Sequence, residues 1–284
     1  SCSLLTSANF DRWVLVRRGV FLFTIGSMFE WVWHGTILPY YGLYFVLASV
    51  VFSWSRRNLA ILASVCTLFA ASLSMWRFFR EQDGHSTSWL GPRSPDSPRN
   101  FVFRYFIDYT HPIFPWFAFF CIGLIIGRSL PWFFANRLRL IAPLSAGIGI
   151  VYGISIAVQR STDGAWQRVT STDPFQRGIF ATVGVSMTAT LVIIIVSLVV
   201  DRLPESTIVV ALTRAGQTTL TLYVLHGLAY NAIVNRLHWV TPTGLDAALG
   251  LSAFMWIFLI TFGAWWNRFI GRGPIERVYR KFGA

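Results

Sequence analysis

The sequence predicts an all-α fold, a polytopic integral membrane bundle of about eight transmembrane helices. Of its 284 residues, 54% are hydrophobic and only 13% are charged, whereas soluble domains carry about 25% charged residues. The apolar residues gather in runs long enough to cross a bilayer, and tryptophans and arginines flank these runs as they do at membrane interfaces. Inside lipid the backbone must satisfy its own polar groups, so each run must be helical.

The first four predicted spans occupy residues 19–33, 42–54, 58–76 and 113–130. Trp33, Trp54 and Trp76 close the first three, and Pro112 precedes the fourth. The long connection 77–112 contains glycine, proline and serine around 84–98 and must be irregular there. Its aromatic stretch 101–109 then predicts a helix on the outer membrane surface.

The last four predicted spans occupy residues 140–158, 178–200, 218–234 and 245–265. The apolar run 208–212 before the seventh span is too short to cross a bilayer. Gly216 follows that run and offers a break, so the seventh segment has the pattern of an interrupted helix.

Arginines predict the orientation, because cytoplasmic loops carry an excess of basic residues. They cluster at one end of successive spans and in the C-terminal tail 266–284. We therefore expect one transmembrane domain over residues 1–284 in the cell (inner or plasma) membrane, with both termini cytoplasmic and the loop 77–112 outside. The net charge of +12 is spread over span ends, which favours membrane lipids as partners and excludes nucleic acid.

The main candidate for chemistry is His226, because ionisable side chains at membrane depth are costly and mark functional sites. Thr219, Tyr223 and His226 recur at i, i+4 and i+7, so one helix face presents a hydroxyl, a phenol and an imidazole. A polar stripe that packs against a neighbouring helix is the alternative interpretation.

Two further pairs are candidates. Asp108 and His111 precede Pro112 at the outer mouth of the fourth span, where a carboxylate could orient an imidazole. Glu30 and His34, four residues apart at the end of the first span, are secondary candidates. Solvent exposure is an equally natural reading of both pairs. The sequence predicts no metal site and no tightly bound cofactor, and it contains no GxSxG, HExxH, P-loop or GxGxxG fingerprint.

The C-terminal passage 266–280, WNRFIGRGPIERVYR, resembles the F-x-x-G-P-L-E-x-x-x-R ending of the YeiB-type bacterial membrane proteins, an uncharacterised family labelled domain of unknown function 418. Three other passages resemble the same family: ILPYYGL at 37–43, IFPWFAFFCIG at 113–123 with Gly127-Arg128, and AGQTTLTLYVLH at 215–226.

That family is similar to the heparan-α-glucosaminide N-acetyltransferase group of transmembrane acyltransferases. The resemblance implies transfer of an acyl group from cytoplasmic acyl-CoA, as co-substrate, to a glycan or lipid acceptor outside. Tyr223 and His226 match the S-L-x-I-Y-L-x-H helix of that class. Its D-x-x-R-G first helix and the histidine loop that follows are not in this sequence, which favours a chain that starts downstream of them.

Acyl transfer from CoA would need a cationic cavity for the phosphates, and arginine suits bidentate phosphate contacts. We expect Arg128, Arg137, Arg139 and Arg214 to form it, although ordinary inside-positive charge explains them as well. We also expect His226 to lie on a path toward Asp108 and His111. The rival functions are a transporter of a small solute or lipid and a non-catalytic membrane partner subunit, and a homo-oligomer stays open.

Overall fold

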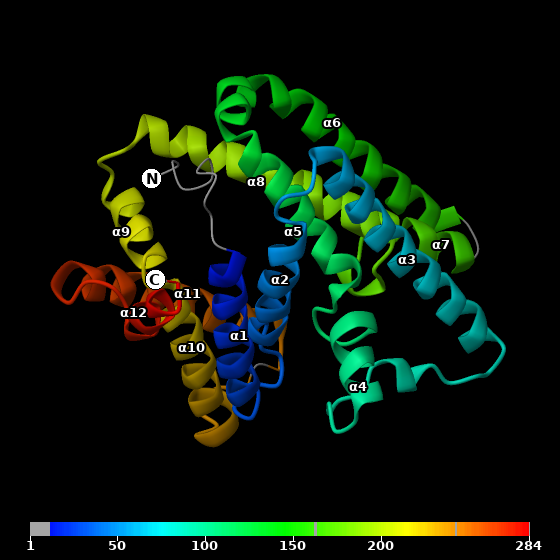
Figure 1. Ribbon diagram of the computed structural model, residues 1–284, viewed down its shortest axis with the longest axis horizontal. Coiled ribbons are helices and arrows are strands. Elements are labelled where there is room, and N and C mark those ends of the chain that lie inside the picture. The colour runs from blue at the N-terminus through cyan, green and yellow to red at the C-terminus, as the bar shows by residue number, and fades with distance from the viewer. Residues whose placement is uncertain (1–11, 162–163, 242, 284) are drawn as a thin grey trace. The chain divides into compact units, whose positions relative to one another are not determined.

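The computed structural model describes residues 12–161, 164–241 and 243–283, which form helices and turns without a strand (Figure 1). Among these described residues, four helices are long and apolar enough to cross a membrane, and a sharply bent pair can count as a fifth span. Two further apolar helices are shorter, at 10–17 residues. The all-α membrane class is therefore supported, whereas the count of about eight spans is not confirmed.

Backbone contacts divide the described chain into two compact units. One is Val50–Leu198, and the other combines residues 12–49 with 199–283. The expectation of one domain over 1–284 stays a prediction.

In the unit Val50–Leu198, α3 (Arg56–Gln82) packs along α5 (Ile113–Arg128). Ser55 caps α3 by accepting the amide hydrogen of Asn58 at 3.2 Å, the usual role of a serine before a first helical turn. Small buried side chains allow the two helices to approach closely; they are Ala63, Cys66 and Ala70 on α3 and Ala118 and Cys121 on α5.

The same unit contains α6 (Leu130–Ser161), α7 (Gly164–Thr170) and α8 (Ile179–Arg202). Two glycines bring α6 and α8 together, because a Cβ on Gly147 would lie 2.9 Å from the Met187 sulfur and one on Gly184 3.3 Å from Val151. The connection 83–112 contains η2, α4 and η3 (Ser88–Leu90, Pro98–Val102 and Phe103–Ile107), and η4 (Pro174–Gln176) precedes α8. The helical prediction for 101–109 is thus confirmed over most of its length.

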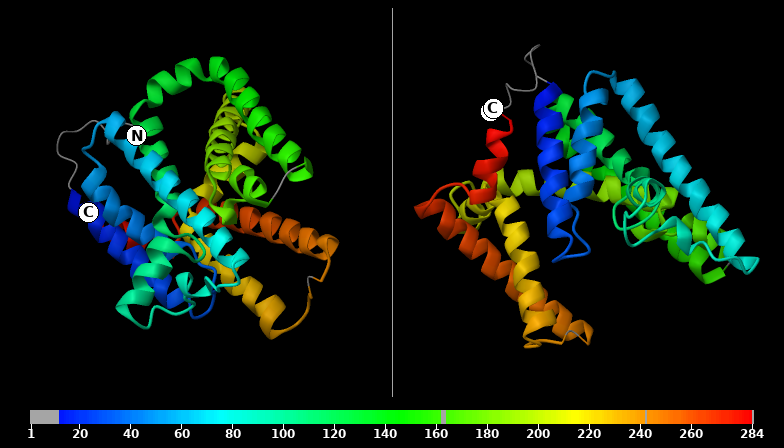
Figure 2. Two further views of the ribbon diagram at one scale, coloured as in Figure 1. Left: turned by 90° about the vertical axis from the view of Figure 1, so that its right-hand side faces the viewer. Right: turned by 60° about the horizontal axis from the view of Figure 1, so that its bottom comes forward.

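In the other unit, α1 (Arg12–Phe29) and α2 (Leu38–Val51) form a tight helical hairpin, as both figures show (Figures 1 and 2). Glycines make the close approach possible: a Cβ on Gly19 would lie 2.6 Å from the Gly42 carbonyl oxygen, and one on Gly26 2.5 Å from the Pro39 nitrogen. Small residues serve the same purpose at interfaces between membrane helices.

The second half of this unit holds α9 (Thr207–Gly216), α10 (Thr219–Tyr230) with its π-helical extension η5 (Asn231–Arg236), and α11 (Leu245–Phe269). The chain bends by 86° between α9 and α10, which confirms the break predicted near Gly216. The tail helix α12 (Pro274–Lys281) packs Tyr279 against Phe21 of α1, with ring centroids 5.8 Å apart.

Candidate functional site

A cavity of about 920 Å³ lies within the unit that contains α9, α10 and α11. Its walls come from these three helices and from Trp33, in the turn between α1 and α2. The volume is at the upper end of the range for small-molecule sites. Most lining side chains are apolar, and the polar ones are concentrated on α10.

One stripe of α10 supplies the polar wall, with Thr219, Tyr223, His226 and Tyr230 lining the cavity in succession. Their spacing of three or four residues places them on one face of the helix. The stripe that the sequence predicted from Thr219 to His226 therefore faces a cavity, and Tyr230 extends it by one turn.

His226 is half-buried, and its ring lies beside Trp33 with the centroids 5.2 Å apart. Trp33 also meets Tyr230 edge-on at 5.0 Å. Gly227 makes room for this packing, since a Cβ there would lie 2.6 Å from Phe29 and 3.0 Å from Trp33. No hydrogen bond from the imidazole to another described residue occurs, so its hydrogen-bonding capacity is not used by the described part of the chain.

The Tyr223 hydroxyl has a different environment. It accepts the amide hydrogen of Ile37 at 2.9 Å and donates to the Thr36 hydroxyl at 3.3 Å. These bonds attach α10 to the start of α2. Tyr223 thus fixes the helix that carries His226, while its ring contributes to the cavity wall.

The N-terminal end of α10 is held by the C-terminal tail. The Glu276 carboxylate on α12 accepts the Thr221 amide hydrogen at 2.9 Å and the Thr221 hydroxyl at 2.5 Å. The N-cap residue Thr218 makes no side-chain cap of its own, so this carboxylate satisfies a free N–H of the first turn and complements the helix dipole. Gly273 is required beside it, because a Cβ there would lie 2.9 Å from the Thr221 Cβ.

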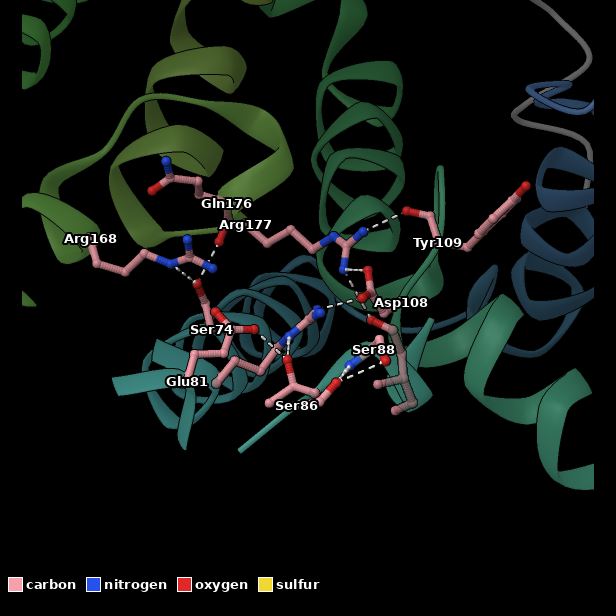
Figure 3. A network of polar contacts seen from close by, with 12 residues as sticks. Ser74, Glu81, Ser86, Ser88, Asp108, Tyr109, Arg168, Gln176 and Arg177 are labelled. Carbon is pink, nitrogen blue, oxygen red and sulfur yellow. Dashed lines mark hydrogen bonds and ion pairs between the residues drawn. The ribbon is translucent and has the colours of Figure 1, made fainter. Parts of the chain in front are cut away.

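Asp108 lies in the unit Val50–Leu198, at the centre of a polar network (Figure 3). Its carboxylate forms ion pairs with both Arg77 and Arg177. Arg177 also donates to the Tyr109 carbonyl oxygen at 2.6 Å. Two guanidinium groups therefore hold this carboxylate, which connects the segment 83–112 to α3 and to the turn before α8.

The network continues away from Asp108 through Ser74, which donates to the Gln176 carbonyl oxygen at 2.7 Å and accepts from Arg168 at 3.0 Å (Figure 3). Arg77 donates to Thr87 at 3.2 Å, and Thr87 in turn donates to Glu81. Burial lowers the pKa of Arg168, with neighbouring charges of both signs adding smaller effects. These contacts hold the connection 83–112 in place against α3.

His111 lies beside Trp116, with ring centroids 4.7 Å apart. Burial lowers its pKa, and the positive charge of Arg177 lowers it further. His111 and Asp108 belong to a different unit from His226, so the predicted path between them stays a prediction.

The four arginines expected to bind CoA phosphates are divided between the units, with Arg214 in one and Arg128, Arg137 and Arg139 in the other. Arg128 donates to the carbonyl oxygens of Phe52 and Trp54 in the same unit. Arg137 donates to Ser197 at 3.2 Å, and Arg139 is exposed. The shared phosphate cavity stays a prediction.

The secondary candidates Glu30 and His34 follow α1, which ends at Phe29. They lie in the turn before α2, where the helical spacing that paired them no longer applies, and His34 is exposed.

Three site residues were missed in the sequence: Trp33, Tyr230 and Glu276. Tyr230 could have been found by extending the α10 stripe by four residues. Trp33 reads as an interfacial anchor, and its contact with His226 spans 193 residues of sequence, which no local pattern reveals. Glu276 and Thr221 are likewise 55 residues apart in the sequence.

Comparison with known protein families matches more than half of the chain to one family model. The family described as "Protein of unknown function (DUF418)" matches residues 132–283, more than half of the chain. The matched segment includes His226 and the tail residue Glu276, and it excludes Trp33 and Asp108. No curated protein and no solved structure matches.

Proposed function

This chain belongs to the DUF418 family of proteins of unknown function, and from that premise we propose that it is a membrane acyltransferase. The acyl group passes from cytoplasmic acyl-CoA to a hydroxyl or amine acceptor on the outer side of the cell membrane, with both chain termini cytoplasmic. The observation that carries the proposal is that the His226 imidazole lies in the wall of a large cavity.

The chemistry requires a base and a stabilised oxyanion. The acceptor oxygen or nitrogen attacks the thioester carbonyl carbon as His226 takes its proton, and a C–O or C–N bond forms. The tetrahedral intermediate then collapses, the C–S bond breaks, and the proton passes from the imidazole to the departing CoA thiolate. The neutral imidazole accepts the first proton, and the imidazolium formed in this way donates it in the second step.

Tyr230 is the second residue of this proposal. It lies one helical turn beyond His226 on the same wall, and no hydrogen bond occupies its hydroxyl among the described residues. A phenol so placed can donate to the developing oxyanion. Tyr223 has a positioning role, because its hydroxyl is bonded to Ile37 and Thr36.

The donor side of the proposal rests on Arg214. It stands at the end of α9 directly before Ala215 and Gly216, which line the cavity. Near the same end of the unit, Asn267 donates to Gln217 at 3.2 Å, so the basic end of α11 at Arg268 approaches the end of α9. Guanidinium groups at this place suit CoA phosphates.

A transporter is the second candidate, and the 86° bend between α9 and α10 favours it. Interrupted helices carry the substrate sites of many secondary transporters. In that reading the cavity beside His226 is the carrier's substrate site, and His226 is a proton-coupled binding residue.

Proteoliposomes containing the purified protein decide between these functions. With acetyl-CoA and palmitoyl-CoA as donors, CoA thiol release and acyl incorporation into acceptor are followed for the wild type, His226→Gln and the control His85→Gln. His85 is an exposed histidine in the outer loop. Loss of a general base costs about 10²–10⁴-fold, so we expect that drop for His226→Gln alone, at unchanged protein yield.

Three results would count against acyl transfer by His226. Equal turnover in both variants would remove its catalytic role. A parallel loss of yield and turnover in His226→Gln would identify a packing histidine. If the wild type releases no CoA thiol with any donor and solute is taken up into the vesicles, the transporter would be established instead.

A further inference from the structure

The two long walls of the cavity differ in chemistry. The α10 wall carries hydroxyl, phenol and imidazole groups from Thr219 to Tyr230. The α11 wall runs from Ala248 to Ile260 and carries aliphatic, methionine and tryptophan side chains, with Ser252 as its one polar residue. At about 1.5 Å per residue, each wall is about 16–18 Å long. The cavity is therefore a slot with one polar and one apolar side.

The slot is closed at the end where α9, α10 and α11 converge. A Cβ on Gly263 would lie 2.6 Å from Leu222, 3.2 Å from the Thr218 hydroxyl and 3.3 Å from the Ala215 Cα. The absence of a side chain at Gly263 thus lets the three helices meet. The side chains of Trp33, His226 and Tyr230 lie at the other end, and each combines a planar ring with a polar atom.

We propose that this slot binds the hydrocarbon chain of a membrane lipid, with the chain along α11, its end toward Gly263, and its polar head at His226 and Tyr230. As a statement about the substrate, this rests on the proposed function: the acyl acceptor is then a lipid whose head carries a hydroxyl or amine.

The depth of the slot selects this occupant. Its walls belong to α11 and to the bent pair α9–α10, which are long and apolar enough to lie across a membrane. Among the described residues the lining contains no Asp, Glu, Lys or Arg, so no charge in this part of the chain would compensate the desolvation of a charged, water-soluble substrate. A lipid chain is already present at this depth.

The closed end and the polar wall confer selectivity. The bilayer is as apolar as the α11 wall, so burial of the chain alone gives little net affinity. Affinity must therefore come from packing within the slot and from hydrogen bonds of the head to the α10 wall. Chains longer than the slot should bind less well, and a lipid without a head-group donor should also bind less well.

Photolabelling tests the proposal. The probe is 1-palmitoyl glycerol with a diazirine at the terminal chain carbon, added to the full chain in nanodiscs without acyl-CoA. We expect labelled peptides from the closed end, around Leu222 and Leu259, and competition by excess unlabelled 1-palmitoyl glycerol. A probe with the diazirine next to the glycerol should instead label the region of Trp33 and Tyr230.

Two neighbouring positions on α11 provide matched variants. Ser252 lines the slot, whereas the exposed Ala253 does not. We expect Ser252→Phe to abolish the competed labelling and Ala253→Phe to retain it. Leu251→Trp is a second filling variant with the same expectation, in case Ser252→Phe lowers the yield of folded protein. Equal competed labelling in all three variants, or labelling that unlabelled lipid does not reduce, would overturn the proposal.

The readout separates this inference from the proposed function. Competed labelling of the slot by a protein that transfers no acyl group would refute the enzyme and leave the lipid site standing. Acyl transfer to a water-soluble acceptor, without labelling of the slot, would refute the lipid site and leave the enzyme standing.

Discussion

The contact between the tail and α10 gives the most direct test of how the site is held. Glu276 on α12 accepts two hydrogen bonds from Thr221, one from the amide and one from the hydroxyl. We consider the substitution Glu276→Gln, which preserves size and one carbonyl oxygen but removes the negative charge. The neutral side-chain amide then has one acceptor oxygen in place of two, so it can accept at most one of the two hydrogen bonds from Thr221.

The magnitude follows from the interactions lost. A hydrogen bond to a charged group contributes about 1.5–3 kcal/mol, and a neutral one about 1 kcal/mol. A negative charge at a helix N-terminus adds about 0.3–1 kcal/mol, and Glu276 is half-buried, so water screens part of this. We expect Glu276→Gln to destabilise the unit by about 1–2 kcal/mol.

Thermal unfolding in detergent, followed by tryptophan fluorescence, measures this. Glu205→Gln is the matched control, because Glu205 is an exposed acid of the same unit. A double-mutant cycle with Thr221→Val isolates the contact: the combined loss should be smaller than the sum of the single losses. A Glu276→Gln midpoint equal to that of Glu205→Gln, or strict additivity in the cycle, would refute the reasoning.

Two further predictions concern packing and pH. Gly263→Ala should destabilise the protein by about 1–3 kcal/mol, because the added Cβ would overpack against Leu222. Gly250→Ala in the same helix has open space around its Cβ and should be neutral or stabilising by up to about 1 kcal/mol. Thermal unfolding midpoints of the two variants measure the difference, and equal midpoints would contradict the prediction. Burial and the charge of Arg177 lower the pKa of His111 in the folded state, so the unfolded chain binds a proton at higher pH than the folded protein does. The wild type should therefore lose stability relative to His111→Gln as the pH falls below about 6.5. Unfolding midpoints of both proteins from pH 8 to 5 measure this, and the same pH dependence in both would contradict the prediction.

The long apolar helices could be predicted because run length alone decides them. The predicted spans 58–76, 178–200 and 245–265 coincide with α3, α8 and α11. The shorter runs are harder to judge. The prediction of a span at 42–54 gave a helix of 14 residues, α2, because the chain turns before Ser55 to cap the next helix.

Helix boundaries near proline are harder to predict. The predicted span 140–158 lies inside a longer helix, α6, which runs from Leu130 to Ser161 through Pro143. At Pro131 the missing N–H is free in any first turn and costs nothing. Pro143 removes one backbone hydrogen bond from the interior of α6, and the neighbouring residues do not determine whether a helix tolerates that loss.

In the site, the polar stripe of α10 could be predicted from helical periodicity, whereas the partners of the Asp108 carboxylate could not be predicted from nearby sequence. The α10 stripe follows from helical geometry, and Tyr223 and His226 both reach the cavity. Asp108 and His111 are close in sequence, but the Asp108 carboxylate binds Arg77 and Arg177, which lie 31 and 69 residues away. A carboxylate accepts from whichever donors the tertiary fold provides, and guanidinium groups bind it strongly.

The contacts of α10 explain why a cavity persists beside it. The first turn is bonded to the tail through Glu276, Tyr223 is bonded to the start of α2, and Gly227 packs against Phe29 and Trp33. These contacts fix the helix independently of α11, so the face from Thr219 to Tyr230 has no need to pack against α11 for α10 to stay in place. An unfilled slot would otherwise cost stability through lost packing, and a bound lipid chain would recover that packing. The tail passage that resembles the family ending therefore acts on the same helix that carries His226.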